Sequence, residues 1–202
     1  MNSTSPSGAA RTRTLATLLC FAAAAALVIF LFTRPAKHSD PPAGQSEVSR
    51  TNLVLEAGRL RLSGETNLFH GLMVEHYQDG ALRSRSAVSN GLLHGLSQGW
   101  YTNAQLQVAE YFIAGVSHGL RTKWYPDGAK QSEAPIVAGK LQGTFRKWHD
   151  NGVLSEQVEL VADQPDGLSK SYFPSGCLKA RVLMKTGKVL EQKFWSDGEQ
   201  RE

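Results

Sequence analysis

Glycine recurs in this chain at a fixed interval of 24 residues, and this spacing constrains the fold more than any other feature. Three series share the interval: Gly71, Gly95, Gly119, Gly143 and Gly167; Gly80, Ala104, Gly128, Gly152 and Gly176; and Gly91, Gly115, Gly139, Asp163 and Gly187. A fixed period is typical of repeat proteins, in which each unit contacts mainly its neighbours. The sequence therefore predicts a repeat domain rather than a domain with one closed core.

Each repeat has the pattern of two antiparallel strands joined by a tight turn. An aromatic or histidine pair precedes each turn, as Trp124-Tyr125 precedes Pro126-Asp127-Gly128. Proline fixes φ at about −65° and cannot take a positive φ, so a type I turn closed by a left-handed glycine is expected. In the second repeat Ala104 stands where the others have glycine, and it is expected to be strained.

Apolar residues also recur with the period, and they are expected to form the stacking core. One column is Val88, Phe112, Ile136, Leu160 and Met184. The glycines of the first two series are assigned turn and packing roles, and strand glycines such as Gly95 and Gly119 are expected to leave room for a ring of the neighbouring repeat. A single hairpin cannot bury its own apolar face, so neighbouring repeats must cover it.

The predicted fold is an all-β, elongated antiparallel meander of stacked hairpins. Residues 67–202 hold five full repeats and a shortened sixth, which ends near Phe194-Trp195 and Asp197-Gly198. Residues 52–66 have the pattern of a degenerate hairpin around Ala57-Gly58, and are expected to cap the first repeat.

A different segment precedes the repeats. Residues Leu15–Phe32 contain no charge, and at about 1.5 Å per residue they span a bilayer core, so a transmembrane helix is predicted over 15–33. The tail 1–14 carries Arg11 and Arg13, which indicate a signal anchor with a cytoplasmic N-terminus. The alternative is a cleaved signal peptide and a secreted domain. Residues 34–51, with three prolines, are predicted to be an extended linker.

This topology predicts a single-pass protein of the inner membrane with an extracytoplasmic repeat domain. The charge distribution agrees with that placement, because residues 1–50 hold five Lys and Arg against two Asp and Glu. Residues 51–202 hold 17 against 16. A nearly neutral repeat domain lacks the basic footprint that nucleic acid requires, so no nucleic-acid partner is expected.

No motif indicates catalysis, a cofactor or a metal. The histidine column His70, His94 and His118 repeats every 24 residues, which places successive rings about 9–10 Å apart, too far to share one ion. Gln142 and Asp166 continue the column, so a structural hydrogen-bonding role is expected. Cys20 and Cys177 are too different in context to predict a disulfide.

The spacing H-G-L-x-x-x-W/Y-Y-x-D-G-x-L, with a glycine four residues before each H-G, resembles the MORN-repeat variant of bacterial proteins. The resemblance covers about residues 67–200. It implies an elongated β-meander and suggests protein or lipid binding. Many such proteins are labelled as antitoxin components of toxin–antitoxin systems, which implies an antitoxin-like role as one possibility.

These observations favour a non-catalytic, membrane-anchored scaffold that binds a partner protein. The candidate contact residues are the exposed aromatic ladder of the middle repeats: Trp100, Tyr101, Trp124, Tyr125, Trp148 and His149. Two alternatives stay open, namely a surface that contacts lipid or envelope polysaccharide and a hydrolase without a familiar motif. The sequence names neither the partner nor the oligomeric state.

Overall fold

The computed structural model describes residues 46–199. The predicted membrane helix at 15–33, the tail before it and most of the predicted linker lie outside these residues. Within residues 46–199 no helix is both long enough and apolar enough to cross a membrane.

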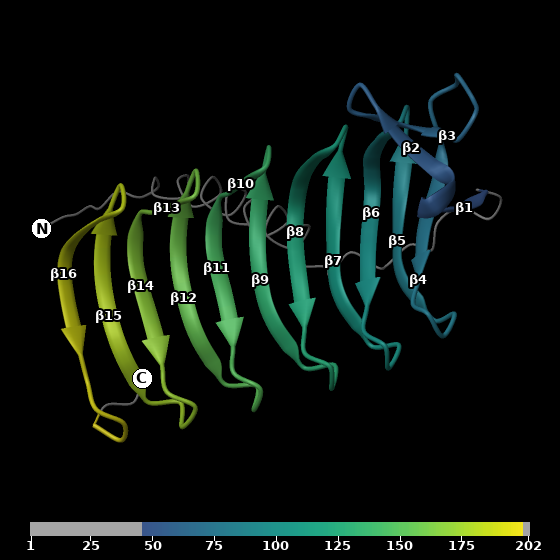
Figure 1. Cartoon of the computed structure of the whole chain (residues 1–202). Helices are drawn as coiled ribbons and strands as arrows, with labels where there is room; N and C mark the ends of the chain where they lie inside the picture. The colour runs from purple at the N-terminus through teal and green to yellow at the C-terminus, as the bar shows by residue number, and fades with distance from the viewer. Residues whose placement is uncertain (1–45, 200–202) are drawn as a thin grey trace, which may run out of the picture. The chain divides into compact units, whose positions relative to one another are not determined.

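The described chain forms one extended sheet of 14 strands and a separate two-stranded sheet. From β4 onward the main strands pair antiparallel in chain order, so the predicted meander of hairpins is confirmed (Figure 1). The large sheet runs in the order β1 (Glu47–Ser49), β4 (Gly71–His76), β5 (Leu82–Ser89), β6 (Leu92–Trp100), β7 (Leu106–Ile113), β8 (Val116–Trp124), β9 (Lys130–Val137), β11 (Gly143–Trp148), β12 (Leu154–Val161), β14 (Gly167–Tyr172), β15 (Leu178–Lys185) and β16 (Lys188–Phe194). The short strands β10 (Lys140–Leu141) and β13 (Gln164–Pro165) pair with β9 and β12.

The N-terminal end of the sheet is covered by a hairpin and by one parallel strand. The hairpin joins β2 (Leu53–Glu56) to β3 (Arg59–Leu62), and it follows a short 3-10 helix, η1 (Arg50–Asn52). Four buried side chains, Leu53, Leu60, Phe69 and Val88, pack together beneath it. The structure therefore places a hairpin where the sequence predicts a cap.

The predicted linker boundary at residue 51 is wrong, because β1 pairs parallel with β4 at Glu47–Ser49. The backbone N–H of Leu72 donates to the carbonyl of Ser46 at 3.1 Å, which extends this pairing by one residue. Val48 packs against the cap core, so this segment contributes both backbone hydrogen bonds and apolar contact. Its proline-poor end behaves as an edge strand rather than as linker.

The hairpins use different turns at the two ends of the sheet. The turns after the aromatic pairs are the predicted type I turns with a left-handed fourth residue. In the third repeat the N–H of Gly128 donates to the carbonyl of Tyr125 at 2.9 Å, and Gly128 has φ +88°. The Asp127 carboxylate accepts the N–H of Ala129 at 2.9 Å, which explains why Asp, Asn or Ser precedes the glycine.

Ala104 occupies the left-handed position of the second repeat with φ +64°. Its N–H still donates to the carbonyl of Tyr101 at 3.0 Å, so the turn forms despite the strain. We expect Ala104→Gly to stabilise the domain by about 1 kcal/mol, because glycine avoids the steric cost of a Cβ in this conformation. Thermal unfolding should show a melting temperature raised by roughly 2–4 °C. An unchanged or lower value would contradict the strain at this turn.

The turns at the opposite end of the sheet have two consecutive residues with positive φ, which defines type I′ geometry. In most repeats alanine rather than asparagine takes the first position, as Ala114 does with φ +49°. The histidine column explains how this end is held. The N–H of Ala114 donates to His94 Nδ1 at 3.3 Å, and that of Ala138 to His118 Nδ1 at 3.4 Å. The predicted hydrogen-bonding role is confirmed for His94 and His118, and Gln142 and Asp166 repeat it. Within residues 46–199 the exposed side chain of His70 forms no equivalent bond.

The apolar column forms the core as predicted. The strand glycines Gly95 and Gly119, however, do not make room for an aromatic ring of the neighbouring repeat. Val88, Ile136 and Leu160 are buried, and Phe112 and Met184 are half-buried. Gly95 has φ +108° and lies at a register shift, where β6 contains two more residues than the paired segment of β5. A Cβ there would meet the Cβ of Ala87 at 3.1 Å and no aromatic ring. The backbone conformation, not space for a ring, therefore favours glycine at position 95, and the same holds at Gly119 with φ +86°. Gly71 differs, because a Cβ there would also meet the Phe69 ring at 3.1 Å.

Candidate interaction surfaces

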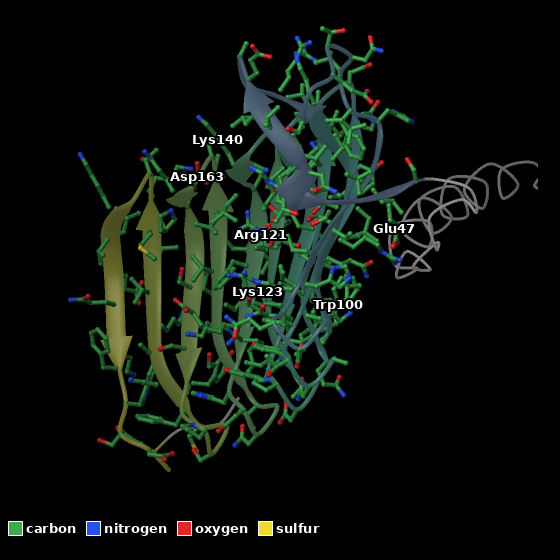
Figure 2. The ribbon with its side chains drawn as sticks, turned by 45° about the vertical axis from the view of Figure 1, so that its right-hand side comes forward. Glu47, Trp100, Arg121, Lys123, Lys140 and Asp163 are labelled. Carbon is green, nitrogen blue, oxygen red and sulfur yellow. The ribbon has the colours of Figure 1, made fainter. Side chains whose placement is uncertain are left out.

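The six predicted contact residues lie at one end of the sheet, where β6, β8 and β11 stop. Trp100, Trp124 and Trp148 are the last residues of these strands, and the second member of each pair opens the turn. Figure 2 shows Trp100 near this end, whereas Lys140 and Asp163 lie at the opposite end. All six side chains are half-buried, so each has an accessible part.

The second members of the pairs tie successive repeats together. Tyr101 Oη donates to the carbonyl of Trp124 at 2.9 Å, and Tyr125 Oη donates to the carbonyl of Trp148 at 2.8 Å. His149 continues the series through Nε2, which lies 3.0 Å from the carbonyl oxygen of Tyr172. Because these polar tips are already bonded, Tyr101, Tyr125 and His149 have a structural role beside the contact role predicted for them.

Asparagine side chains add a second set of bonds between the same turns. Asn103 Nδ2 donates to the carbonyl of Pro126 at 2.7 Å, and Asn151 Nδ2 to the carbonyl of Pro174 at 2.8 Å. The acceptors are carbonyls, so the bonds do not depend on the identity of the side chain there. Side-chain hydrogen bonds therefore join each turn at this end of the sheet to the next, and they hold the backbone that carries the indoles.

The indole rings of the first members, Trp100, Trp124 and Trp148, are half-buried and take no part in these hydrogen bonds between repeats. Two of them lie beside a cation: Arg85 Cζ is 5.9 Å from the Trp100 ring centroid, and Lys130 Nζ is 5.3 Å from that of Trp148. Lys130 interrupts a column that is otherwise leucine, and it also pairs with Glu133 at 2.6 Å. The arrangement is a row of indoles with positive charge at its sides.

In the fifth repeat Asp166 replaces histidine at the opposite end of the sheet. Its carboxylate accepts the N–H of Thr186 at 3.3 Å and binds Lys185 Nζ at 2.8 Å. The hydrogen bond from Lys185 holds the pKa of this carboxyl below its ordinary value. A lowered pKa in the folded state stabilises the fold above the unfolded pKa of about 3.9, and this stabilisation is lost as the pH falls through the lower folded value.

We therefore expect Asp166→Asn to lower the melting temperature slightly at pH 7 and to have less effect near pH 3. The amide oxygen can still accept from Thr186, but it carries no charge for Lys185. Thermal unfolding of both proteins between pH 7 and pH 3 measures the difference. A difference that stays constant with pH would show that the charge of Asp166 contributes nothing.

A pocket of about 300 Å³ opens on one face of the C-terminal repeats. Its lining comes from β12, β14 and β15, with Pro165 of β13. No sequence motif indicates this pocket, although the repeat columns carry a signal: Ser169 and Ser171 stand where the preceding repeat has Phe145 and Lys147. A large residue replaced by a small one leaves space beside the strand.

The last hairpin concentrates positive charge. Between Leu178 and Trp195 there are five Lys and Arg residues and one acid, Glu191, although the repeat domain as a whole is nearly neutral. Apolar side chains are exposed on the same hairpin, with Leu190 64% and Phe194 63% exposed. This combination is suited to an anionic surface with an apolar layer.

Among residues 46–199, no three His, Cys, Asp or Glu side chains converge on a possible metal position. In the histidine column, His94 Nδ1 and His118 Nδ1 accept hydrogen bonds from backbone N–H groups.

Comparison with protein families gives one match. The family model of the MORN repeat variant matches residues 141–161, which contain β11 and β12. The resemblance inferred from the sequence is confirmed over this repeat. Steps of 24 residues carry the same window to 69–89, 93–113, 117–137 and 165–185, and each of these holds the equivalent hairpin. No curated protein matches the chain.

Proposed function

We propose that this MORN-type domain of β-hairpin repeats is a non-catalytic scaffold that binds a partner protein along Trp100, Trp124 and Trp148. The observation that carries the proposal is the recurrence of one half-buried indole in three consecutive repeats, on turns fixed by hydrogen bonds between repeats. Tryptophan is enriched among the residues that dominate protein interfaces. A rigid frame also lowers the entropy lost on binding.

Crosslinking in cells tests this surface. A photo-reactive amino acid at position 124 should give a discrete adduct with one protein. The same residue at Lys140, which is exposed at the opposite end of the sheet, serves as the control (Figure 2). No adduct at position 124, or the same adduct at both positions, would contradict binding along the tryptophan row.

The proposal includes an inner-membrane location. The uncharged run Leu15–Phe32 and the flanking Arg11 and Arg13 support a single-pass anchor with the repeats outside the cytoplasm. A reporter fused at Glu202 tests this orientation: alkaline phosphatase should be active there, and a fluorescent protein that folds in the cytoplasm should be dark. The reverse result would place the repeats in the cytoplasm, where an antitoxin-like role becomes the better explanation.

A second candidate function is contact with anionic lipid or envelope polysaccharide, and the basic, partly apolar hairpin of β15 and β16 favours it. Lysine and arginine close to an anionic membrane each contribute about 1 kcal/mol. Vesicles containing anionic lipid, and purified cell wall, should then bind the protein at low salt. Variants that replace Lys188 and Lys193 with glutamate should bind less, and unchanged pelleting would exclude this surface.

A further inference from the structure

The pocket in the C-terminal repeats is built from one face of three neighbouring strands. The register places Ser169 opposite Val182, Ser171 opposite Ala180, and Glu156 opposite Ser171. Residues two apart in a strand share a face, which adds Val158 and Met184 to the same side. The floor and walls are therefore largely apolar, with Ser169, Ser171 and Glu156 as the polar side chains on this face. Lys170 also lines the pocket, but it lies between the two serines on β14, and alternation along a strand directs its side chain to the opposite face.

The repeat columns explain why the hollow lies here. One repeat earlier, Phe145 and Lys147 occupy the positions of Ser169 and Ser171, and they face Val158 and Glu156. In the fifth repeat, alanine also replaces glutamate, at position 180. Three side chains have thus become small in one patch while the surrounding backbone is unchanged.

Ser169 is unusual within its own column. Ser169 is only 7% exposed, and its Oγ has no hydrogen-bond partner. In earlier repeats Ser97 Oγ lies 2.7 Å from Ser86 Oγ, and Arg121 pairs with Glu110 at 2.7 Å. A buried hydroxyl without a partner costs about 1–3 kcal/mol, so a ligand that bonds to it recovers that cost.

Glu156 supplies the negative charge on this face of the pocket. It is half-buried, and among residues 46–199 its carboxylate forms no ion pair or hydrogen bond. Lys147 lies opposite it across the strands without an ion pair between them. A free carboxylate beside an orphan hydroxyl and an apolar wall matches a cation on an apolar stem.

We propose that this pocket binds a lysine side chain of the partner protein. The four methylene groups contact Val158, Val182 and Met184, and the ammonium group donates hydrogen bonds to Ser169 Oγ and the Glu156 carboxylate. A compact ammonium with three donors suits two acceptors in a small pocket. This inference rests on the proposed protein-binding role, and it assigns a chemical group to one point of that contact.

The test uses n-butylammonium, which copies the lysine side chain, on the full-length protein in detergent micelles. The chain has three methionines, Met1, Met73 and Met184, so labelled methionine methyl groups give three NMR signals. Titration should shift the Met184 signal saturably and leave the Met73 signal in place. Butanol and butyrate should bind at least tenfold more weakly.

Variants make the test specific. Glu156→Gln should weaken butylammonium binding about tenfold, and Ser169→Phe should abolish it. The second variant is expected to fold because phenylalanine occupies the same column position at Phe145, and an unchanged Met73 signal checks this. Lys147→Ala removes the neighbouring amine and should leave the affinity equal or higher.

Two results would overturn the inference: no saturable shift at Met184, or butyrate binding as strongly as butylammonium. Either leaves the tryptophan row untouched, because crosslinking at position 124 reports on that surface separately. Conversely, butylammonium binding without any crosslinked partner would support an amine pocket and contradict the protein-binding role.

Discussion

Replacing Gly91 with alanine is expected to destabilise the domain by about 3 kcal/mol, the sum of a left-handed backbone and a steric clash. Gly91 has φ +72°, and an added Cβ would lie 2.8 Å from the carbonyl oxygen of Leu60 and 2.9 Å from its nitrogen. The third close atom is Arg59 Cβ at 2.9 Å, and neither this Cβ nor the two backbone atoms can move away by a side-chain rotation. The Gly91 carbonyl also accepts the N–H of Leu60 at 2.8 Å, so the clash falls on the contact that joins the cap to the first repeat.

Gly115 provides the matched control. It holds the same turn position one repeat later with φ +84°, but a Cβ there would meet nothing closer than Leu92 Cδ2 at 3.6 Å. Gly115→Ala should therefore cost only the backbone strain, about 1 kcal/mol. Thermal unfolding should show a melting temperature roughly 10 °C lower for Gly91→Ala and about 3 °C lower for the control. Equal losses would contradict the tight packing of the cap.

Most of the fold could be predicted from the 24-residue period, because glycine is favoured where φ is positive and therefore recurs at equivalent turns and bulges. The type I turns follow from Pro126, Asp127 and Gly128, since each residue restricts a particular dihedral angle or bonds to the turn. The sequence did not show why position 95 needs glycine. The cause is the register shift between β5 and β6, and such a shift depends on the pairing of two strands and not on local preference. Edge strand β1 was missed for a related reason: three residues are too few for a periodic signal.

Side-chain hydrogen bonds to backbone carbonyls also could not be predicted from the sequence. Tyr101 Oη donates to the backbone carbonyl of residue 124, and every residue type has such a carbonyl, so no particular residue is required there. The tyrosines were therefore grouped with the tryptophans as contact residues, although their polar tips bind the next repeat. The pocket at Ser169 depends on a deviation from the repeat columns, so it becomes clear only when the register aligns Phe145 with Ser169.

Replacing Trp100 and Trp124 together with alanine is expected to weaken partner binding by a factor of about 100 or more. Interface tryptophans commonly contribute about 2 kcal/mol or more each, which corresponds to roughly 30-fold per residue. The Trp100 ring also loses its contact with the Arg85 guanidinium, whose carbon lies 5.9 Å from the ring centroid. The effect should appear mainly as faster dissociation.

The fold should survive this double change. Tyr77 and Tyr101 bond to the backbone carbonyls of residues 100 and 124, and alanine keeps both carbonyls. Lys123→Ala serves as a matched substitution, because this residue precedes Trp124 on β8 and its side chain is exposed (Figure 2). A melting curve for each variant separates lost binding from lost structure.

The most direct test of the scaffold is chemical crosslinking in the membrane fraction, followed by recovery of the full-length protein. The wild-type protein and Lys123→Ala should recover the same partner in similar yield, and the folded Trp100→Ala/Trp124→Ala variant should recover almost none. Recovery of that partner at the wild-type level by the folded double variant would contradict binding along the tryptophan row.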